Sequence, residues 1–284
     1  MIGVRVPAST SNLGAGFDCL GLALDLWMDV KVVEGEDEPV YTGTVAGLDY
    51  RNEILVGIVR DTVSPRHHLQ IHSEIPLARG LGSSAAAAVA GYALKQLLQE
   101  KGLERDEVYE SAVSHEGHPD NAGAATYGGF VLAAPRPARL AFNQSLGIAL
   151  AVPDIPIDTN TARGILPATL PRAATIRQAS RAAALVLGLM NAEGDLIGYG
   201  MDDQIAVPLR KGLIPGYDQA VSAGVEAGAF GVTISGSGSA VVAIAPRERA
   251  PEVAVAMAHA LTKHESIAEP LTPEVSERGV GLLE

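Results

Sequence analysis

Hydrophobic and polar positions alternate in several stretches of the chain, and β-branched residues are frequent in them. A period of two residues with this composition is typical of a β-strand that buries one face. Strands are therefore expected over residues 4–8, 23–35, 68–76, 126–134 and 231–245. A glycine-serine turn interrupts the last stretch, so we expect it to form two strands.

Other stretches carry strong helix formers between residues that commonly cap helices. After Gly82, two serines precede a run rich in alanine and leucine that continues to Gly102, a pattern typical of a capped helix. Further helices are expected over residues 104–117, 174–192, 215–228 and 251–264.

Residues 145–160 include a stretch that is rich in proline and polar residues. Such a composition is typical of a connection between structural units. We therefore expect two lobes of mixed helices and strands, residues 1–150 and 151–284, with a cleft between them.

Composition and charge narrow the class of protein. The chain has 284 residues, 47% of them apolar, which is enough to bury a substantial core. Its net charge of −12 argues against nucleic acid as a partner, because a phosphate backbone requires a basic surface. The single cysteine, Cys19, fits a reducing compartment. The sequence shows neither a secretory signal nor an apolar run long enough for a membrane, so we expect a cytoplasmic protein.

Residues 79–88, RGLGSSAAAA, form a glycine-containing turn that leads into a helix. Gly80 and Gly82 would let the backbone approach an anion and point successive amides at it. The helix beginning near Ser83 or Ser84 would add unpaired amides and the positive end of its dipole. A plain helix cap after a tight turn explains the same residues equally well.

Two further stretches could belong to the same site. SGSGSA, at residues 235–240, is a second glycine-serine turn, although a simple hairpin loop also explains it. EGHPDNAG gathers Glu116, His118, Asp120 and Asn121 within six residues. Capping and turn formation explain that cluster about as well as acid–base or metal chemistry does.

Isolated polar and charged residues complete the set of candidates. Asn12 and Asp18, in PASTSNLGAGFD, are short polar groups suited to orienting a small substrate, or belong to an ordinary loop. Arg163 and Arg210 could grip a carboxylate in this acidic chain, since a guanidinium binds a carboxylate bidentately. Solvation at the surface is the alternative for both. The simplest interpretation of Asp202-Asp203 is the start of a loop.

Three motifs in this order, PASTSNLGAGFD, PLARGLGSSAAAA and ISGSGSA, resemble those of the GHMP kinases, the superfamily of galactokinases, homoserine kinases and mevalonate kinases. Within it the sequence is most similar to the homoserine kinases, through SNLGAGFD, EGHPDNAGAATYGGF, TNTARGILP and DDQIAVPLRKGLIPGYD. The similarity spans essentially the whole chain.

The resemblance implies an α+β fold of two domains, ribosomal-S5-like over residues 1–150 and ferredoxin-like over residues 151–284. It implies ATP and Mg²⁺ as cofactors, and transfer of the γ-phosphoryl group to the side-chain hydroxyl of L-homoserine, a step in threonine biosynthesis. Members of the family are often dimers, so the resemblance also points to a homodimer, while charge and the lack of a long apolar run argue against a nucleic-acid or membrane partner.

Site residues carry over from the family position by position. The positions that match the ATP site are Arg79, Gly80, Leu81, Gly82, Ser83, Ser84, Ala85 and, for adenine, Asn52. Ser84 and Glu116 match the magnesium ligands, with Glu110 as the alternative to Glu116. The positions that match the substrate site are Asn12, Asp18, His118, Asp120, Asn121, Thr159, Arg163, Arg210, Ser235, Gly236, Ser237 and Gly238.

One position departs from the mevalonate kinases, which place an aspartate where Asn121 best aligns. A dedicated general base is therefore not expected, and Asn121 and Asn12 would orient the substrate hydroxyl. Together with Glu116 and Ser84 they form the expected catalytic set. The alternatives are a kinase for another carboxylate-bearing alcohol such as mevalonate, or a non-catalytic sensor of the same fold.

Overall fold

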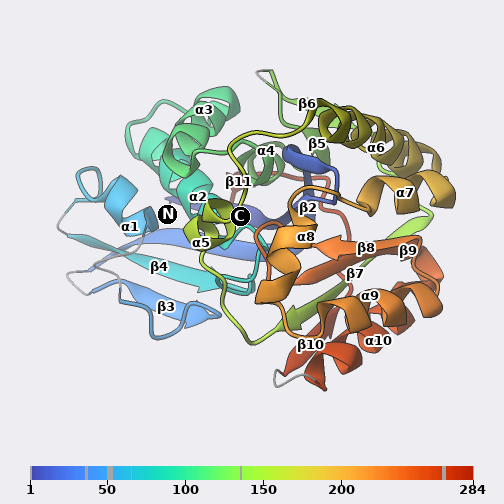
Figure 1. Ribbon diagram of the computed structural model, residues 1–284. Helices are drawn as coiled ribbons and strands as arrows, with labels where there is room; N and C mark the ends of the chain where they lie inside the picture. Colours follow the sequence, from blue (N-terminus) through green and yellow to red (C-terminus); the bar gives the residue numbers. More distant parts are fainter. Residues whose placement is uncertain are drawn as a thin grey trace.

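A computed structural model of the chain describes residues 2–35, 38–49, 54–64, 66–134, 136–263 and 267–283. Two β-sheets form its centre, and helices cover them from several sides (Figure 1). Across these described residues, no helix has both the length and the apolar character needed to cross a membrane.

The first sheet has seven strands and contains most of the N-terminal half. Its strands are β1 (Ile2–Asn12), β2 (Gly16–Glu34), β3 (Val40–Gly43), β4 (His67–Ser73), β5 (Phe130–Leu132), β6 (Ala138–Leu140) and β11 (Gly281–Leu282). The main path is β11-β1-β2-β4-β3, and β5 joins β2 to β6. All pairs are antiparallel except β3 with β4.

Four helices accompany this sheet: α1 (Ile54–Val59), α2 (Ser83–Leu98), α3 (Arg105–Glu116) and α4 (Asp120–Tyr127). The alanines in the first half of α2 are fully buried. Their small side chains allow α2 to lie close to β1 and α4, which it contacts. The alanine run thus brings the start of α2 next to strand β1.

The second sheet has the order β10-β7-β9-β8, with every neighbouring pair antiparallel. Its strands are β7 (Leu146–Pro153), β8 (Gly231–Ile234), β9 (Val241–Pro246) and β10 (Ala268–Leu271). Helices α9 (Tyr217–Glu226) and α10 (Ala250–Thr262) pack on it. This β-α-β-β-α-β arrangement is the ferredoxin-like one that the resemblance implies.

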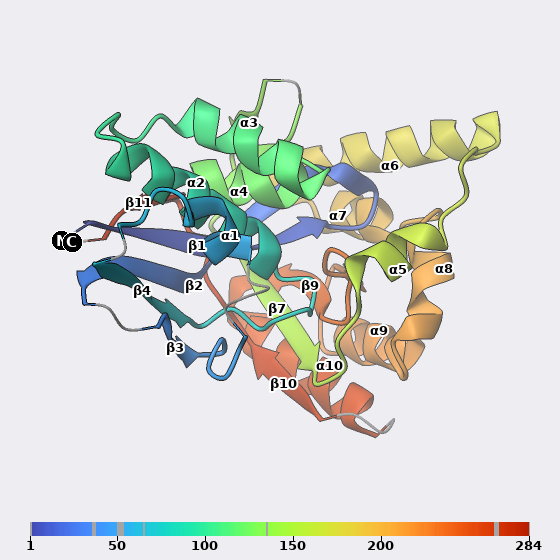
Figure 2. The ribbon, with the colours of Figure 1, turned by 90° about the vertical axis from the view of Figure 1, so that its left-hand side faces the viewer.

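Helices between β7 and β8 flank both sheets (Figures 1 and 2). Besides α9, they are α5 (Thr159–Gly164), α6 (Arg172–Asn191), α7 (Gly194–Met201) and α8 (Val207–Arg210). α6 packs against α7, and α7 packs against β8. In Figure 2, α5 lies beside α8 at one end of the molecule.

The sheets change between β6 and β7, so the expected boundary at residue 150 passes through β7. The end of the chain then returns to the first sheet, where β11 pairs with β1. Consequently the first strand of the chain and the last lie side by side. The sequence did not reveal this return, because β11 is only two residues long.

One local expectation was wrong. Residues 120–127 form helix α4, where a polar turn and then a strand were expected, and the strand β5 starts only at Phe130. Asn12 and Leu13 lie in a tight turn that joins β1 directly to β2. Both have positive φ angles, a conformation that asparagine adopts more easily than most residues.

Backbones of the two units approach closely at Gly80. A Cβ atom there would lie 2.0 Å from the carbonyl oxygen of Ser235, in the loop between β8 and β9. Gly80 also has a φ of +74°. Only glycine satisfies both conditions, so this residue permits the first unit's glycine turn to contact the second unit's loop.

Replacing Gly80 with alanine is therefore expected to destabilise the protein strongly. Gly102→Ala is the matched control, since Gly102 has a φ of +77° and no atom would lie within 4 Å of its Cβ. The control carries only the cost of the backbone conformation, roughly 1–2 kcal/mol. Gly80→Ala adds the clash, about 2 kcal/mol more, measured by urea unfolding. Equal losses would show that the two units are not in close contact at Gly80.

Candidate active site

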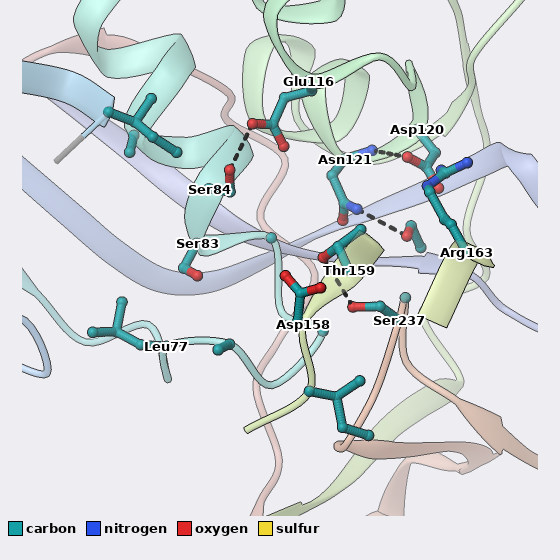
Figure 3. Close-up of a pocket in the computed structure, with 18 of the residues that line it drawn as sticks. Leu77, Ser83, Ser84, Glu116, Asp120, Asn121, Asp158, Thr159, Arg163 and Ser237 are labelled. Atoms are coloured by element: carbon teal, nitrogen blue, oxygen red, sulfur yellow. Dashed lines mark hydrogen bonds between the residues drawn. The ribbon is translucent and has the colours of Figure 1, made fainter. Parts of the chain in front are cut away.

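A cavity of about 370 Å³ lies between the two units, within the size range of ligand pockets. Its walls come from β1, the start of α2, the end of α3, the start of α4, helix α5, Arg210 and the loop after β8. Figure 3 shows the side chains that face this space.

One wall is the start of helix α2. Gly82, with a φ of +70°, precedes the helix, and no side chain in the described structure caps the amides of its first turn. Gly80, Gly82, Ser83 and Ser84 all line the cavity. Free amides, the helix dipole and two serine hydroxyls make this wall suited to an anion such as a phosphate.

A chain of polar groups runs from Ser84 into the wall formed by α3 and α4 (Figure 3). The Ser84 hydroxyl donates a hydrogen bond of 2.6 Å to Glu116 Oε1. His118 Nε2 lies 3.9 Å from Glu116 Oε2, and His118 Nδ1 lies 3.0 Å from Asp120 Oδ1. The hydrogen bond with Asp120 raises the pKa of His118 against the opposing effect of burial.

Asn121 is fixed in one orientation at the centre of the site. Its Oδ1 accepts a hydrogen bond of 2.9 Å from Ser9, and its Nδ2 donates one of 2.9 Å to Ser11. Its backbone amide donates to Asp120 Oδ1 at 2.8 Å. Ser9 and Ser11 are two residues apart in β1, so their side chains lie on the same face of the sheet.

Asp18 and Arg163 form a bidentate ion pair between the two units. The two N–H···O distances are 3.0 and 2.6 Å. Asp18 has a positive φ, and its amide donates to the side chain of Asn12. Hydrogen bonding to Asp18 raises the pKa of the Arg163 guanidinium above its ordinary value.

Arg210 is different, because it is only 3% exposed and no carboxylate in the described residues lies within ion-pair distance. Its guanidinium donates to the carbonyl oxygens of Ala162, at 2.9 Å, and Gly236, at 3.2 Å. It also lies over the Phe17 ring. Burial lowers the pKa of Arg210, since the charged form is desolvated.

The loop after β8 ties these walls together. Ser235 shares a hydrogen bond of 2.8 Å with Thr10 and donates one of 2.7 Å to the carbonyl of Gly80. The Ser237 hydroxyl lies 3.4 Å from the Thr159 hydroxyl, and both residues line the cavity. The carbonyl of Gly236 accepts hydrogen bonds from both Asn12 and Arg210.

Most of the expected site residues meet at this cavity. Those that line it are Asn12, Gly80, Gly82, Ser83, Ser84, Glu116, Asp120, Asn121, Thr159, Arg163, Arg210, Gly236 and Ser237. Asp18, His118 and Ser235 are held one contact behind it through the hydrogen bonds described above. Gly238 does not line the cavity and lies in the same loop.

The remaining candidates lie elsewhere. The Arg79 guanidinium donates to the carbonyl oxygens of Leu77, Pro153 and Asp154, so it joins the two units and does not reach the cavity. Leu81 and Ala85 are buried in the core. Glu110 is exposed on α3, away from the cavity lining, and Asn52 lies outside the described residues.

Sequence reasoning missed the apolar end of the cavity, which is lined by Met28, Val45, Leu48, Ile54, Leu77 and Ala87. These residues come from separate elements, and only the fold places them together. It also missed Asp158, which lines the cavity, and the burial of Asp203.

A magnesium ion fits the donor set at Ser84 and Glu116. The described residues contain no cluster of three or more side chains that could hold a metal by themselves. Mg²⁺ does not require such a cluster, because it keeps several waters and usually binds one or two protein oxygens together with substrate phosphates. A serine hydroxyl and a carboxylate beside an anion-binding helix start match that preference.

The raised pKa of His118 makes a contribution to stability that depends on pH. Protonated His118 interacts favourably with Asp120 and Glu116 in the folded protein. This stabilisation is fully present below the ordinary histidine pKa of about 6.5 and disappears as the pH rises through the higher folded-state value. Urea unfolding of wild type and His118→Gln should show a stability difference that shrinks between pH 6 and pH 9. A difference that grows with pH would contradict this electrostatic account.

Two family models match the chain. Residues 51–129 match the GHMP kinases N-terminal domain, and residues 182–263 match the GHMP kinases C-terminal domain. The matched regions contain the start of α2 and the loop after β8, which form two walls of the cavity.

Individual relatives match over much more of the chain. A homoserine kinase from Picosynechococcus sp. is 36% identical, covering 90% of this chain and 90% of the relative. One from Desulfitobacterium hafniense is 33% identical over the full length of both. The crystal structure of homoserine kinase from Cytophaga hutchinsonii is similar with a TM-score of 0.85 and 29% identity, covering 99% of this chain and 97% of that one. The chain therefore belongs to the GHMP kinases and, within them, to the homoserine kinase family.

Proposed function

We propose that this chain transfers the γ-phosphoryl group of ATP to the side-chain hydroxyl of L-homoserine, forming O-phospho-L-homoserine. The observation that carries this proposal is the charge pattern at one end of the cavity, where Arg163 and Arg210 line the wall and Asp18, paired with Arg163 just behind it, keeps 33% of its side chain exposed. Asp18 offers a negative charge, while Arg163 and the unpaired Arg210 offer positive charges. An α-amino acid presents the complementary pair, an ammonium beside a carboxylate.

ATP would occupy the other part of the cavity. Its phosphates suit the start of α2, and its base suits the apolar end formed by residues such as Met28, Leu48 and Leu77. The expected adenine contact at Asn52 remains a prediction. Arg79 is engaged with backbone carbonyls, so the side chain would support the fold around ATP without binding it.

Ser84 and Glu116 would hold Mg²⁺, which neutralises charge on the transferring phosphate. Their 2.6 Å hydrogen bond already aligns both oxygens at the edge of the cavity. Ser84 would offer a hydroxyl oxygen and Glu116 a carboxylate oxygen to the ion. His118 would keep Glu116 oriented from behind.

The side chains of Asn121 and Asn12 would orient the acceptor hydroxyl, because both residues line the cavity next to the start of α2. Asp120 is a weaker candidate for a general base. Its side chain is buried, and Oδ1 already accepts hydrogen bonds from His118 and from the Asn121 amide. Positioning and charge neutralisation account for most of the acceleration in such reactions, so a dedicated base is not required.

Substrate identity would depend on the ion pair of Asp18 with Arg163. A carboxylate oxygen can accept more than one hydrogen bond, so Asp18 can bind an ammonium while it still holds Arg163. The substrate carboxylate would then lie against Arg210 and the free face of Arg163. Mevalonate has a carboxylate but no ammonium, and would leave Asp18 without its second partner.

The place in threonine biosynthesis follows from the homoserine substrate and belongs to the same proposal. A homodimer, which the resemblance implies, also remains a prediction.

Glu116→Gln tests the magnesium role. Because the amide has no charge, we expect the ATP-dependent kcat/KM to fall by about a hundredfold or more, as for other lost transition-state electrostatic contacts. The apparent Mg²⁺ requirement should rise as well, and a coupled ADP-release assay at varied Mg²⁺ measures both.

Glu110→Gln is the matched control on the same helix, because Glu110 is exposed and does not line the cavity. Its activity should stay within about twofold of wild type, as expected for a surface substitution away from special features. If Glu110→Gln were the damaging change and Glu116→Gln were neutral, the proposed magnesium site would be wrong.

Asp18→Asn tests the recognition of the ammonium. The variant should lose preference for homoserine over 4-hydroxybutanoate, which is homoserine without its amino group. We expect the ratio of the two kcat/KM values to fall by about tenfold or more, the value of a lost charged hydrogen bond. Asp195→Asn, an exposed change on α7, should leave the ratio unchanged. An unchanged ratio in Asp18→Asn would exclude Asp18 as the ammonium site.

A further inference from the structure

Arg210 requires something to hold it, because it is a buried cation on a very short helix. Its helix, α8, has only four residues, and a helix of that length is not stable by itself. The guanidinium contacts backbone carbonyls of Ala162 and Gly236 but no carboxylate in the described part of the chain. Its position therefore depends on where α8 is anchored.

The anchor of α8 is the carboxylate of Asp203, which is 3% exposed. Its Oδ2 accepts hydrogen bonds of 2.6 Å from the amides of both Ala206 and Val207, at the start of the helix. Its Oδ1 accepts from the Ile205 amide at 3.2 Å and from the side chain of Gln178. A carboxylate at this place satisfies amides that the short helix leaves unpaired and interacts favourably with the helix dipole.

Asp203 is also close enough to Arg210 to act through charge. The two residues line the same small hollow behind the active site, together with Phe17. Burial lowers the pKa of Arg210, and the nearby Arg163 lowers it further, whereas the charges of Asp18, Asp203 and Asp120 oppose the shift. A negative charge on this side helps to keep the buried guanidinium charged.

Asp203 and Arg210 also connect α8 to helices α6 and α5. Gln178 belongs to α6, so its hydrogen bond links α8 to α6. On the other side, Arg210 donates to the carbonyl of Ala162 in α5. Figure 2 shows α8 beside α5, the helix that carries Arg163. Asp203 thus lies at the junction of the segments that present both arginines to the cavity.

We infer that Asp203 is a positioning residue for Arg210, which fixes the guanidinium where it binds the carboxylate of the amino-acid substrate. This inference rests on the proposed function, because it takes Arg210 to be the carboxylate site. Asp203 does not line the cavity that would hold the substrate. Its effect on catalysis therefore passes through Arg210.

Asp203→Ala is the direct test, with Asp202→Ala as the matched control. Asp202 is exposed and interacts with Arg181 and Gln204, away from α8. Loss of the cap and its charge should raise the homoserine KM by about tenfold, the scale of a lost cap of 1–2 kcal/mol. The ATP KM should stay within about twofold in both variants, and kcat should change by less than about threefold. A KM effect of equal size for ATP and homoserine would reduce Asp203 to a general structural role and overturn the inference.

Asp203→Asn guards against a variant that fails to fold. Its side-chain oxygen can still accept from the amides of Ala206 and Val207, but the charge is gone. We expect the homoserine KM of Asp203→Asn to lie between the KM values of wild type and Asp203→Ala. Melting temperatures of all variants show whether each one is folded. A homoserine KM that does not change in Asp203→Asn and Asp203→Ala alike would contradict the inference.

A double-mutant cycle with Arg210→Ala tests the positioning role of Asp203 separately from the role of Arg210 as the carboxylate site. If Asp203 acts through Arg210, the Asp203→Ala change should have little further effect on the homoserine KM when Arg210 is already alanine. Fully additive effects would overturn the positioning role. If Arg210→Ala itself left the homoserine KM unchanged, the carboxylate site of the proposed function would be wrong, whatever Asp203 does.

Discussion

The close approach of two backbones at Gly80 is the constraint on which the site depends. Gly80 and Gly82 bring the start of α2 against β1 and the loop after β8, so that groups from three parts of the chain meet. A Cβ at Gly82 would lie 2.1 Å from the hydroxyl of Ser9, the residue that orients Asn121. Gly80 therefore sets the distance between the two units, and Gly82 sets the distance between the start of α2 and strand β1.

The second constraint is electrostatic. Two arginines line one cavity of a chain whose net charge is −12, and their surroundings differ. Arg163 is paired with Asp18, whereas Arg210 is buried, donates to backbone carbonyl oxygens and lies over an aromatic ring, and no carboxylate of the described residues is within ion-pair distance of it. A buried cation without an ion partner is costly, and a bound carboxylate would offset that cost. The cavity is therefore prepared for an anionic group at this place.

Sequence patterns predicted much of this arrangement and missed particular parts for physical reasons. Local signals identified α2, α3 and the pair β8–β9, because capping residues and glycines mark their ends. The motifs indicated Asn12, Ser84, Glu116 and Arg210, which the fold brings to one cavity. Asp203 looked like the start of a loop, since nothing local distinguishes a buried cap from an exposed aspartate. The apolar end of the cavity depends on tertiary packing alone.

The most direct measurement of the central claim is a coupled ADP-release assay of the wild-type protein with ATP, Mg²⁺ and a panel of acceptors. The panel contains L-homoserine, mevalonate, galactose and threonine, and mass spectrometry identifies the phosphorylated product. The account predicts that L-homoserine has the highest kcat/KM and yields O-phospho-L-homoserine. Turnover of none of these acceptors would favour a non-catalytic sensor, and better turnover of mevalonate would contradict the charge-based assignment of the substrate.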